Sequence, residues 1–427
     1  MKGKRCFFGS AVIALLLSTG TKDVMADDSF LPPSALMIQQ QFMTDDSIFE
    51  VPEITRNDLN TAQIDELNEA IRNYAGKETS LLINDAASFY FYEHLDPLPK
   101  EIYNLLYQVA EDPVSEGNIQ LMMTTMDPGS DDFELEFYHA WYSLTYDHPE
   151  LFWVYPSSGE AKFTYAWYPK MINGRYMVYF QMEEPFNAFE EQMTEFNQAA
   201  TDFLAGIDQT ASQHEIIKQV HDNLIDLVVY DVPCCERHAP DLAHTAYGVL
   251  IANSIGTPNY AVCDGYSFAF EYMLQQFHIP VTVVMGYGGS SPSEMGGHAW
   301  SIVYLDNEWY EVDSTWDDNA IDEEFNEPLY DPASFMRIKE FINDPFFRER
   351  LGHYLFLISS DLMGHYTTTP DSSWDFYFSD GYGPVNLAPS DCYHTREDEY
   401  TISNLEGINP ISDLMLLVPH APHSYEQ

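Results

Sequence analysis

Residues 261–274, AVCDGYSFAFEYML, decide the fold that this sequence predicts. The apolar residues that follow Cys263 predict a helix largely surrounded by protein, with Cys263 at or just before its N-terminus. The positive end of a helix dipole favours a thiolate, so this position suits a reactive cysteine. Pro280 then starts a strand that we expect from Val281 to Met285.

Two further strands are predicted downstream, in 296–306 (GGHAWSIVYLD) and 308–318 (EWYEVDSTWDD). Asp306-Asn307 between them suits a tight hairpin turn. With a two-residue turn, Trp300 lies opposite Asp313, and His298 is a diagonal neighbour of Asp313 on the same face. A slip of one residue in register would put them on opposite faces.

Cys263, His298 and Asp313 are the residue types that nucleophilic catalysis through a thioester requires. The imidazole takes the proton of the thiol, and the carboxylate fixes the tautomer of the imidazole. Each residue alone also has an ordinary structural role: a buried cysteine, a histidine at a strand start, a carboxylate at a turn. Their order and spacing together favour the catalytic interpretation, with a catalytically silent centre as the alternative.

Three strings, CDGY at 263–266, HAW at 298–300 and WYEVDSTWDD at 309–318, resemble the core of the transglutaminase-like superfamily, of the secreted bacterial type. The resemblance continues upstream to about residue 206. It implies an α+β fold with a papain/transglutaminase-like core, in which a helix bearing the nucleophile packs on an antiparallel sheet bearing the base and the orienting carboxylate. Carried over residue by residue, these are Cys263, His298 and Asp313.

The same segments suggest supporting residues. Tyr230, in VVYD, is a candidate oxyanion donor beside the backbone N–H of Cys263, and a tyrosine of the core is the equally open alternative. Candidates for lining the cleft are Asp264, Gly265, Tyr266, Trp300 and Trp316.

The resemblance implies a cysteine acyltransferase, peptidase or amidase that attacks protein or peptide amides. Cross-linking, deamidation and hydrolysis stay open, and so does a silent module that binds cell-wall or protein partners.

With 18 basic and 68 acidic residues, the chain has a formal net charge of −50, which opposes binding to nucleic acid and anionic membranes. A hydrophobic content of 45% is ample for a packed core. The oligomeric state is not predicted.

Residues 1–26 have the pattern of a secretory signal. It starts with the basic residues Lys2, Lys4 and Arg5, continues with a short apolar stretch at 7–17, and has small residues suited to a cleavage site at 24–26. We therefore expect a protein that is secreted, periplasmic or held at the cell envelope, without membrane insertion after cleavage. An uncleaved anchor is the alternative.

The expected mature chain has four cysteines: Cys234, Cys235, Cys263 and Cys392. If Cys263 stays free, export favours a disulfide from Cys392 to Cys234 or Cys235. Adjacent cysteines without a second pair make a poor zinc site, and the acidic runs lack the spacing of an EF-hand. The prediction is that there is no metal site and no cofactor, with the use of calcium left open.

Four parts are predicted along the chain. They are a signal peptide at 1–26, an N-terminal α+β accessory domain at 27–207, a transglutaminase-like catalytic domain at 208–366 and a C-terminal extension at 367–427. Within the accessory domain, the expected elements are helices at 61–74, 100–110 and 133–146, a hairpin of 162–168 with 175–182, and a long helix at 186–207.

Overall fold

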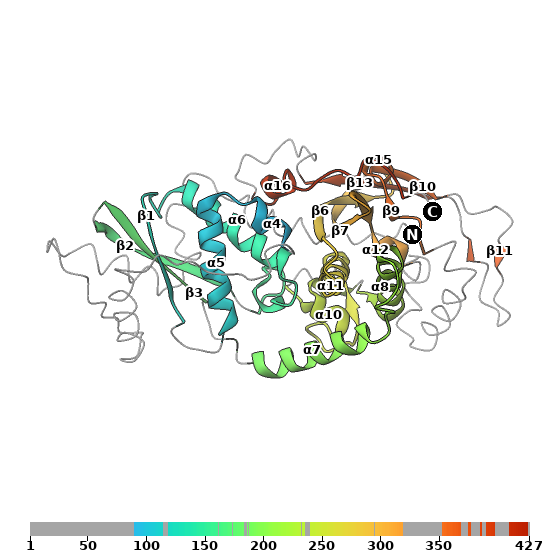
Figure 1. Cartoon of the computed structure of the whole chain (residues 1–427), viewed down its shortest axis with the longest axis horizontal. Helices are drawn as coiled ribbons and strands as arrows, with labels where there is room; N and C mark the ends of the chain where they lie inside the picture. The colour runs from blue at the N-terminus through green and yellow to red at the C-terminus, as the bar shows by residue number, and fades with distance from the viewer. Residues whose placement is uncertain are drawn as a thin grey trace. The chain divides into compact units, whose positions relative to one another are not determined.

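The fold is taken from a computed structural model (Figure 1). It describes residues 89–113, 118–160, 162–172, 174–182, 186, 188–231, 233–234, 240–293, 295–318, 352–368, 375–376, 385–386, 390–397 and 410–425. The predicted signal at 1–26 and helix at 61–74 lie outside these residues. The chain divides into two compact units, with the main boundary between Gln198 and Ala199.

The N-terminal unit contains helices α4 (Tyr90–His94), α5 (Pro97–Glu111) and α6 (Asp131–Asp147). Proline at the start of α5 suits the first helical turn, where its missing N–H has no helical partner to lose. The Ser130 side chain accepts a hydrogen bond from the N–H of Phe133 and so caps α6. Helices α5 and α6 contain the predicted helical segments 100–110 and 133–146, and they pack on each other.

A three-stranded antiparallel sheet completes this unit, in the order β1-β3-β2. Its strands are β1 (Gln120–Thr124), β2 (Phe163–Ile172) and β3 (Arg175–Met182). Strands β2 and β3 form the predicted hairpin, with Gly174 at a φ of 79° that favours glycine. The long helix α7 (Phe189–Leu204) follows.

Several helices of the C-terminal unit precede its main sheet in the chain. They include α8 (Gln213–Leu227), α10 (Ala246–Leu250) and α11 (Cys263–Gln275). The short strands β4 (Val229–Tyr230) and β5 (Tyr260–Ala261) pair in parallel and bring the chain to the start of α11. No helix in the described part of the chain has the length and apolarity needed to cross a bilayer.

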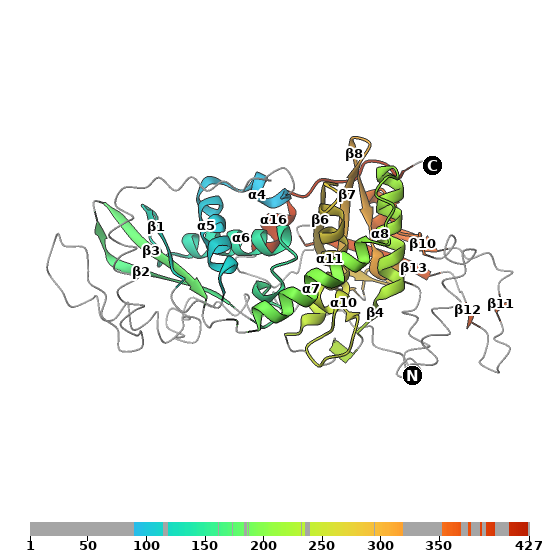
Figure 2. The same ribbon diagram turned by 60° about the horizontal axis from the view of Figure 1, so that its bottom comes forward.

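The main sheet has six strands in the order β10-β13-β6-β7-β8-β9, and every neighbouring pair is antiparallel. The strands are β6 (Val281–Gly289), β7 (Met295–Leu305), β8 (Glu308–Val312), β9 (Phe356–Ile358), β10 (His365–Thr368) and β13 (Ser390–Arg396). Helix α11 packs against β6 and β7 (Figures 1 and 2). This confirms the predicted α+β core, in which the helix bearing Cys263 lies on an antiparallel sheet.

The predicted hairpin joins β7 to β8. Asp306 and Asn307 have φ values of 52° and 71°, the left-handed conformations of the tight turn that matches strand twist. Ser301 pairs with Val312, so Trp300 stands opposite Asp313 as expected.

The glycine-rich stretch before His298 belongs largely to two paired strands. Strand β6 continues to Gly289, β7 begins at Met295, and Gly288 pairs with Gly296. A Cβ atom on Gly288 would lie 3.0 Å from the ring of His298, so glycine leaves the space that the imidazole occupies. The glycines serve close packing across the strands.

Residues after 366 contribute directly to the main sheet. Strand β13 lies between β10 and β6, and its backbone pairs with both. The described remainder of this region contains the two-residue strands β11 (Asp375–Phe376) and β12 (Val385–Asn386) and the helix α16 (Pro410–Met415).

A buried ion pair holds β13 to the rest of the unit. Arg396 Nη2 lies 2.6 Å from Glu311 Oε1 on β8, and both side chains are buried. Arg396 also donates to the carbonyl oxygens of Val418 and Pro419, and Glu311 accepts a hydrogen bond from Trp300 Nε1. Two strands and the C-terminal segment therefore depend on one guanidinium–carboxylate contact.

We expect Arg396→Met to destabilise the protein by about 3–5 kcal/mol, because it leaves the Glu311 carboxylate buried without its cation. Chemical denaturation followed by fluorescence measures the change. Asp391→Asn is the matched control, since Asp391 lies on the same strand but is exposed. Equal transitions for wild type and Arg396→Met would contradict the importance of this ion pair.

Candidate active site

Asp313 is held rigidly at the end of β8. It caps the short helix α12 (Ser314–Asp317), with Oδ1 accepting the N–H groups of Thr315 and Trp316 at 3.0 and 3.1 Å. Burial raises the pKa of Asp313, but the charges and hydrogen bonds of His298 and His394 outweigh burial and hold the pKa well below its usual range. Asp313 is therefore an anion with a fixed direction.

His298, on β7, is oriented by this carboxylate. Its Nε2 lies 2.8 Å from Asp313 Oδ2, which places the Nε2 proton in that hydrogen bond and leaves Nδ1 as the basic nitrogen. The ring of Trp316 lies 5.0 Å from the imidazole, centroid to centroid, and Gly288 lies beneath it. The structure thus brings together two of the three predicted catalytic residues with the predicted hydrogen bond.

Cys263 is the first residue of α11, and its side chain is buried. Burial raises the pKa of Cys263 well above its ordinary value, and the negative charge of Asp264 adds to this effect. The backbone N–H groups of Ala299, the residue next to His298 on β7, and of Asp264 oppose the rise in this pKa. The resting group is therefore a neutral thiol that needs a base when it reacts.

His394, on β13, also contacts Asp313 and was not predicted. Its Nε2 lies 2.9 Å from Asp313 Oδ2, and its Nδ1 lies 3.0 Å from the carbonyl oxygen of Met363. Burial lowers the pKa of His394, while the carboxylate of Asp313 opposes this effect. One carboxylate oxygen thus holds two imidazoles. The sequence around His394 offers no motif that would link it to the site, because it is a single histidine in a polar segment 81 positions from Asp313.

Asp264, the residue after Cys263, belongs to a second group of a carboxylate, an imidazole and a thiol, together with His244 and Cys234. The Nδ1 atom of His244 is 2.9 Å from both oxygens of Asp264, and its Nε2 is 3.8 Å from the sulfur of Cys234. Burial lowers the pKa of His244, but Asp264 and Cys234 outweigh burial and raise the pKa well above its ordinary value. A protonated His244 therefore offsets part of the negative charge that Asp264 places beside Cys263.

The other predicted site residues lie around this centre. Tyr230 pairs with Ala261 in β5, two positions before Cys263, and packs on Cys234, Ala243 and Val262. Among the residues proposed to line a cleft, four are buried and Trp316 is half-buried: Asp264, Gly265, Tyr266 and Trp300.

The buried candidates have partners in the core. Tyr266 donates a hydrogen bond to Asp318, and Trp300 donates to Glu311. A Cβ atom on Gly265 would meet the carbonyl oxygens of Ala243 and Thr245, so glycine permits this close helix packing.

The predicted disulfide from Cys392 to Cys234 is wrong, because these two residues are not joined. Cys234 is buried against Ala243 and Val262, whereas Cys392 lies on β13 opposite Tyr366 of β10. Cys235 lies outside the described residues.

Three groups among the described residues hold possible metal-ligand atoms within 4.8 Å of one another. They are His221, Asp222 and His353; His298, Asp313 and His394; and Asp231, Cys234 and Asp241. Hydrogen bonds to Asp313 already account for the geometry of the second group.

Part of this unit is similar to known proteins. Residues 200–314, which include Cys263, His298 and Asp313, match the family model of the transglutaminase-like superfamily. The chain is similar to the kyphoscoliosis peptidases of Mus musculus and Homo sapiens, 39% identical to each over 67 residues. That similarity covers 14% of this chain and 10% of each peptidase. A solved structure described as a TGase is 16% identical over 36% of this chain and 44% of its own, with a TM-score of 0.24.

We expect Asp264→Asn to lower the pKa of the Cys263 thiol by on the order of one pH unit, because it removes a neighbouring negative charge. The rate of Cys263 alkylation against pH, followed on the Cys263 peptide by mass spectrometry, measures this change. In the wild type, the rate should still rise above the ordinary thiol pKa of 9.0.

Asp361→Asn, at an exposed position on α15 (Ser360–Gly364), is the control and should leave the alkylation profile unchanged. An unshifted profile in Asp264→Asn would show that this carboxylate does not act on the thiol.

Proposed function

Because residues 200–314 form a domain of the transglutaminase-like superfamily, we propose that this chain is a secreted cysteine enzyme that acts on protein or peptide amides through a thioester. One observation carries the proposal. The 2.8 Å contact of His298 Nε2 with Asp313 Oδ2 fixes a base on β7, next to the residue whose N–H binds the Cys263 thiol. In this proposal, Cys263 on α11 is the nucleophile, His298 on β7 is the base, and Asp313 at the end of β8 is the orienting carboxylate.

In the first half of the reaction, His298 Nδ1 takes the proton of Cys263 as the sulfur attacks the amide carbonyl carbon. The resulting oxyanion lies at the N-terminus of α11, where the N–H of Cys263 has no partner within the helix. Tyr230 is the proposed second donor, since β4 runs beside the strand that leads into Cys263. His298 then protonates the departing nitrogen, the carbon–nitrogen bond breaks, and a thioester remains.

In the second half, water or an amine attacks the thioester and Cys263 regains its proton. Hydrolysis is the outcome that we propose to test first, because the similar mouse and human proteins are named peptidases. Transfer to an amine uses the same thioester and differs only in the acceptor. A silent module that binds protein partners is the competing function.

The proposed site of action is outside the cell. The signal-like pattern of residues 1–26 supports export, and the net charge of −50 suits cationic or lysine-rich protein partners rather than nucleic acid. The chain spans only 10% of the length of the peptidases that it resembles. The substrate class proposed for this protein is therefore not taken from those peptidases.

We expect Cys263→Ala to reduce turnover by about 10³-fold or more, because the thioester cannot form. Mass spectrometry of a mixture of glutamine- and lysine-containing peptides detects a cut backbone, a deamidated glutamine or a cross-link. Cys392→Ala, which changes a cysteine on β13 that has no role in the proposed reaction, is the control and should keep full activity. No reaction in the wild type, together with slow alkylation of Cys263, would favour the silent module.

His394→Phe should lower kcat by about 10-fold with little change in KM, because it removes one of the two imidazoles that hold Asp313 but keeps the ring volume. Steady-state kinetics with the best peptide substrate measures both constants. His365→Phe is the matched control, since His365 lies on the adjacent strand and its side chain is 52% exposed. A variant with wild-type kcat would mean that Asp313 needs only His298.

A further inference from the structure

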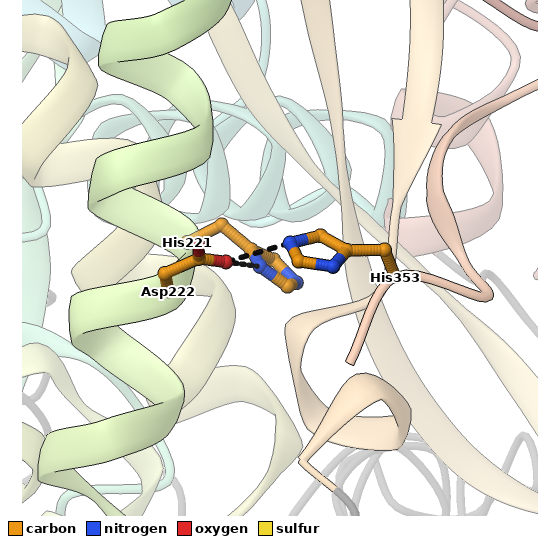
Figure 3. A group of neighbouring side chains, drawn as sticks. All are labelled: His221, Asp222 and His353. Carbon is orange, nitrogen blue, oxygen red and sulfur yellow. Dashed lines mark hydrogen bonds and ion pairs between the residues drawn. The ribbon is translucent and has the colours of Figure 1, made fainter. Parts of the chain in front are cut away.

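A second group of polar side chains lies in the same unit and has no part in the proposed reaction. His221 and Asp222 come from α8, and His353 comes from the segment just before β9. His353 Nε2 is 2.7 Å from Asp222 Oδ1, and His221 Nδ1 is 3.2 Å from the same oxygen. Figure 3 shows the three side chains converging on one point.

This convergence is unusual for neighbours on a helix. Consecutive helical residues point about 100° apart and do not normally face each other. Here the side chains of His221 and Asp222 both turn toward His353, which lies 131 positions from Asp222. His221 is fully buried, whereas His353 and Asp222 are 12% and 17% exposed, so the group reaches solvent on one side.

The distances suit a small divalent ion. The three ligand atoms lie within 4.8 Å of one another. Ligands about 2.0 Å from a tetrahedral zinc ion are separated by about 3.3 Å, so modest side-chain movement would seat an ion between them. Two imidazoles and a carboxylate form a ligand set that zinc accepts, with a fourth position left for water. Calcium and magnesium prefer oxygen ligands alone.

Outer contacts position these ligands. His221 Nε2 lies 3.2 Å from Asp317 Oδ2, on the side of the ring opposite Asp222, at ion-pair distance but outside hydrogen-bond geometry. A carboxylate there favours the tautomer with the proton on Nε2, which leaves the lone pair of Nδ1 for a metal. Asp317 Oδ1 accepts the N–H of Leu355, and Lys218 binds the second oxygen of Asp222.

We propose that His221, Asp222 and His353 form a binding site for a divalent transition metal ion of the zinc type, with Asp317 as the residue that orients His221. The site goes beyond the proposed function and does not depend on it. An ion there would tie α8 to the segment before β9. Through Asp317, the last residue of α12, it would also steady the helix that Asp313 caps.

Equilibrium dialysis of the full chain against Zn²⁺, with metal measured by mass spectrometry, tests the proposal. We expect one zinc ion per chain in the wild type, and a loss of affinity on the order of 100-fold in His353→Ala. Bound Co²⁺ should give visible absorption bands in the wild type that His353→Ala lacks. Zinc should raise the Tm of the wild type and leave that of His353→Ala unchanged.

Three control variants test whether zinc binds at a different group of side chains. His365→Ala removes an exposed histidine that pairs with Asp391, and it should bind zinc like the wild type. His394→Ala and Cys234→Ala remove a member of each of the other two groups, and they should also retain zinc. A fourth variant, Asp317→Asn, should weaken zinc binding by about 10-fold while keeping the three ligands.

Several outcomes would overturn the proposal. Absence of bound zinc in the wild type would mean that the three residues form a hydrogen-bonded group only. Loss of zinc in His394→Ala or Cys234→Ala, with retention in His353→Ala, would assign the ion elsewhere. If His353→Ala melts well below the chelator-treated wild type, His353→Gln replaces it, and normal zinc binding by His353→Gln would reject the site.

Discussion

The carboxylate of Asp313 is the constraint on which the rest of the site depends. One of its oxygens closes the first turn of α12 and the other holds His298 and His394, so strands β7, β8 and β13 meet at a single side chain. A buried anion of this kind is stable only with enough polar partners, and four groups contact Asp313: the N–H groups of Thr315 and Trp316 and the rings of His298 and His394. The geometry that favours a reactive thiol is therefore also a requirement of folding.

The parts of the fold that local chemistry determines were predictable. Asp306 and Asn307 specify a tight turn, and from that turn the register of β7 on β8 follows, including Trp300 opposite Asp313. The apolar helix after Cys263 was likewise evident from its pattern. Both features depend on neighbours within a few positions, where spacing is informative.

Contacts between distant segments were not predictable. His394 and Arg396 lie in the segment predicted as a C-terminal extension. No local pattern in the sequence indicates that β13 pairs with β6 in the main sheet. The group of His221, Asp222 and His353 has the same origin, since adjacent helical residues and a histidine 131 positions away form no motif. The error over Cys392 also arose because cysteine counts say nothing about which strands bring thiols together.

The position of β13 has a consequence for the order of assembly. Strands β6 and β7 are close in the chain and can pair as soon as both have been synthesised. The residues of β13 that pair with β6 lie more than a hundred positions after it, so that pairing comes later. Pairing over such separations is slow, because closing the long loop costs conformational entropy before the stabilising contacts between the strands can form. Until residues 390–396 are available, one edge of β6 is unpaired and Asp313 lacks its contact with His394. A truncated chain would therefore have an immature centre and a sheet edge prone to association.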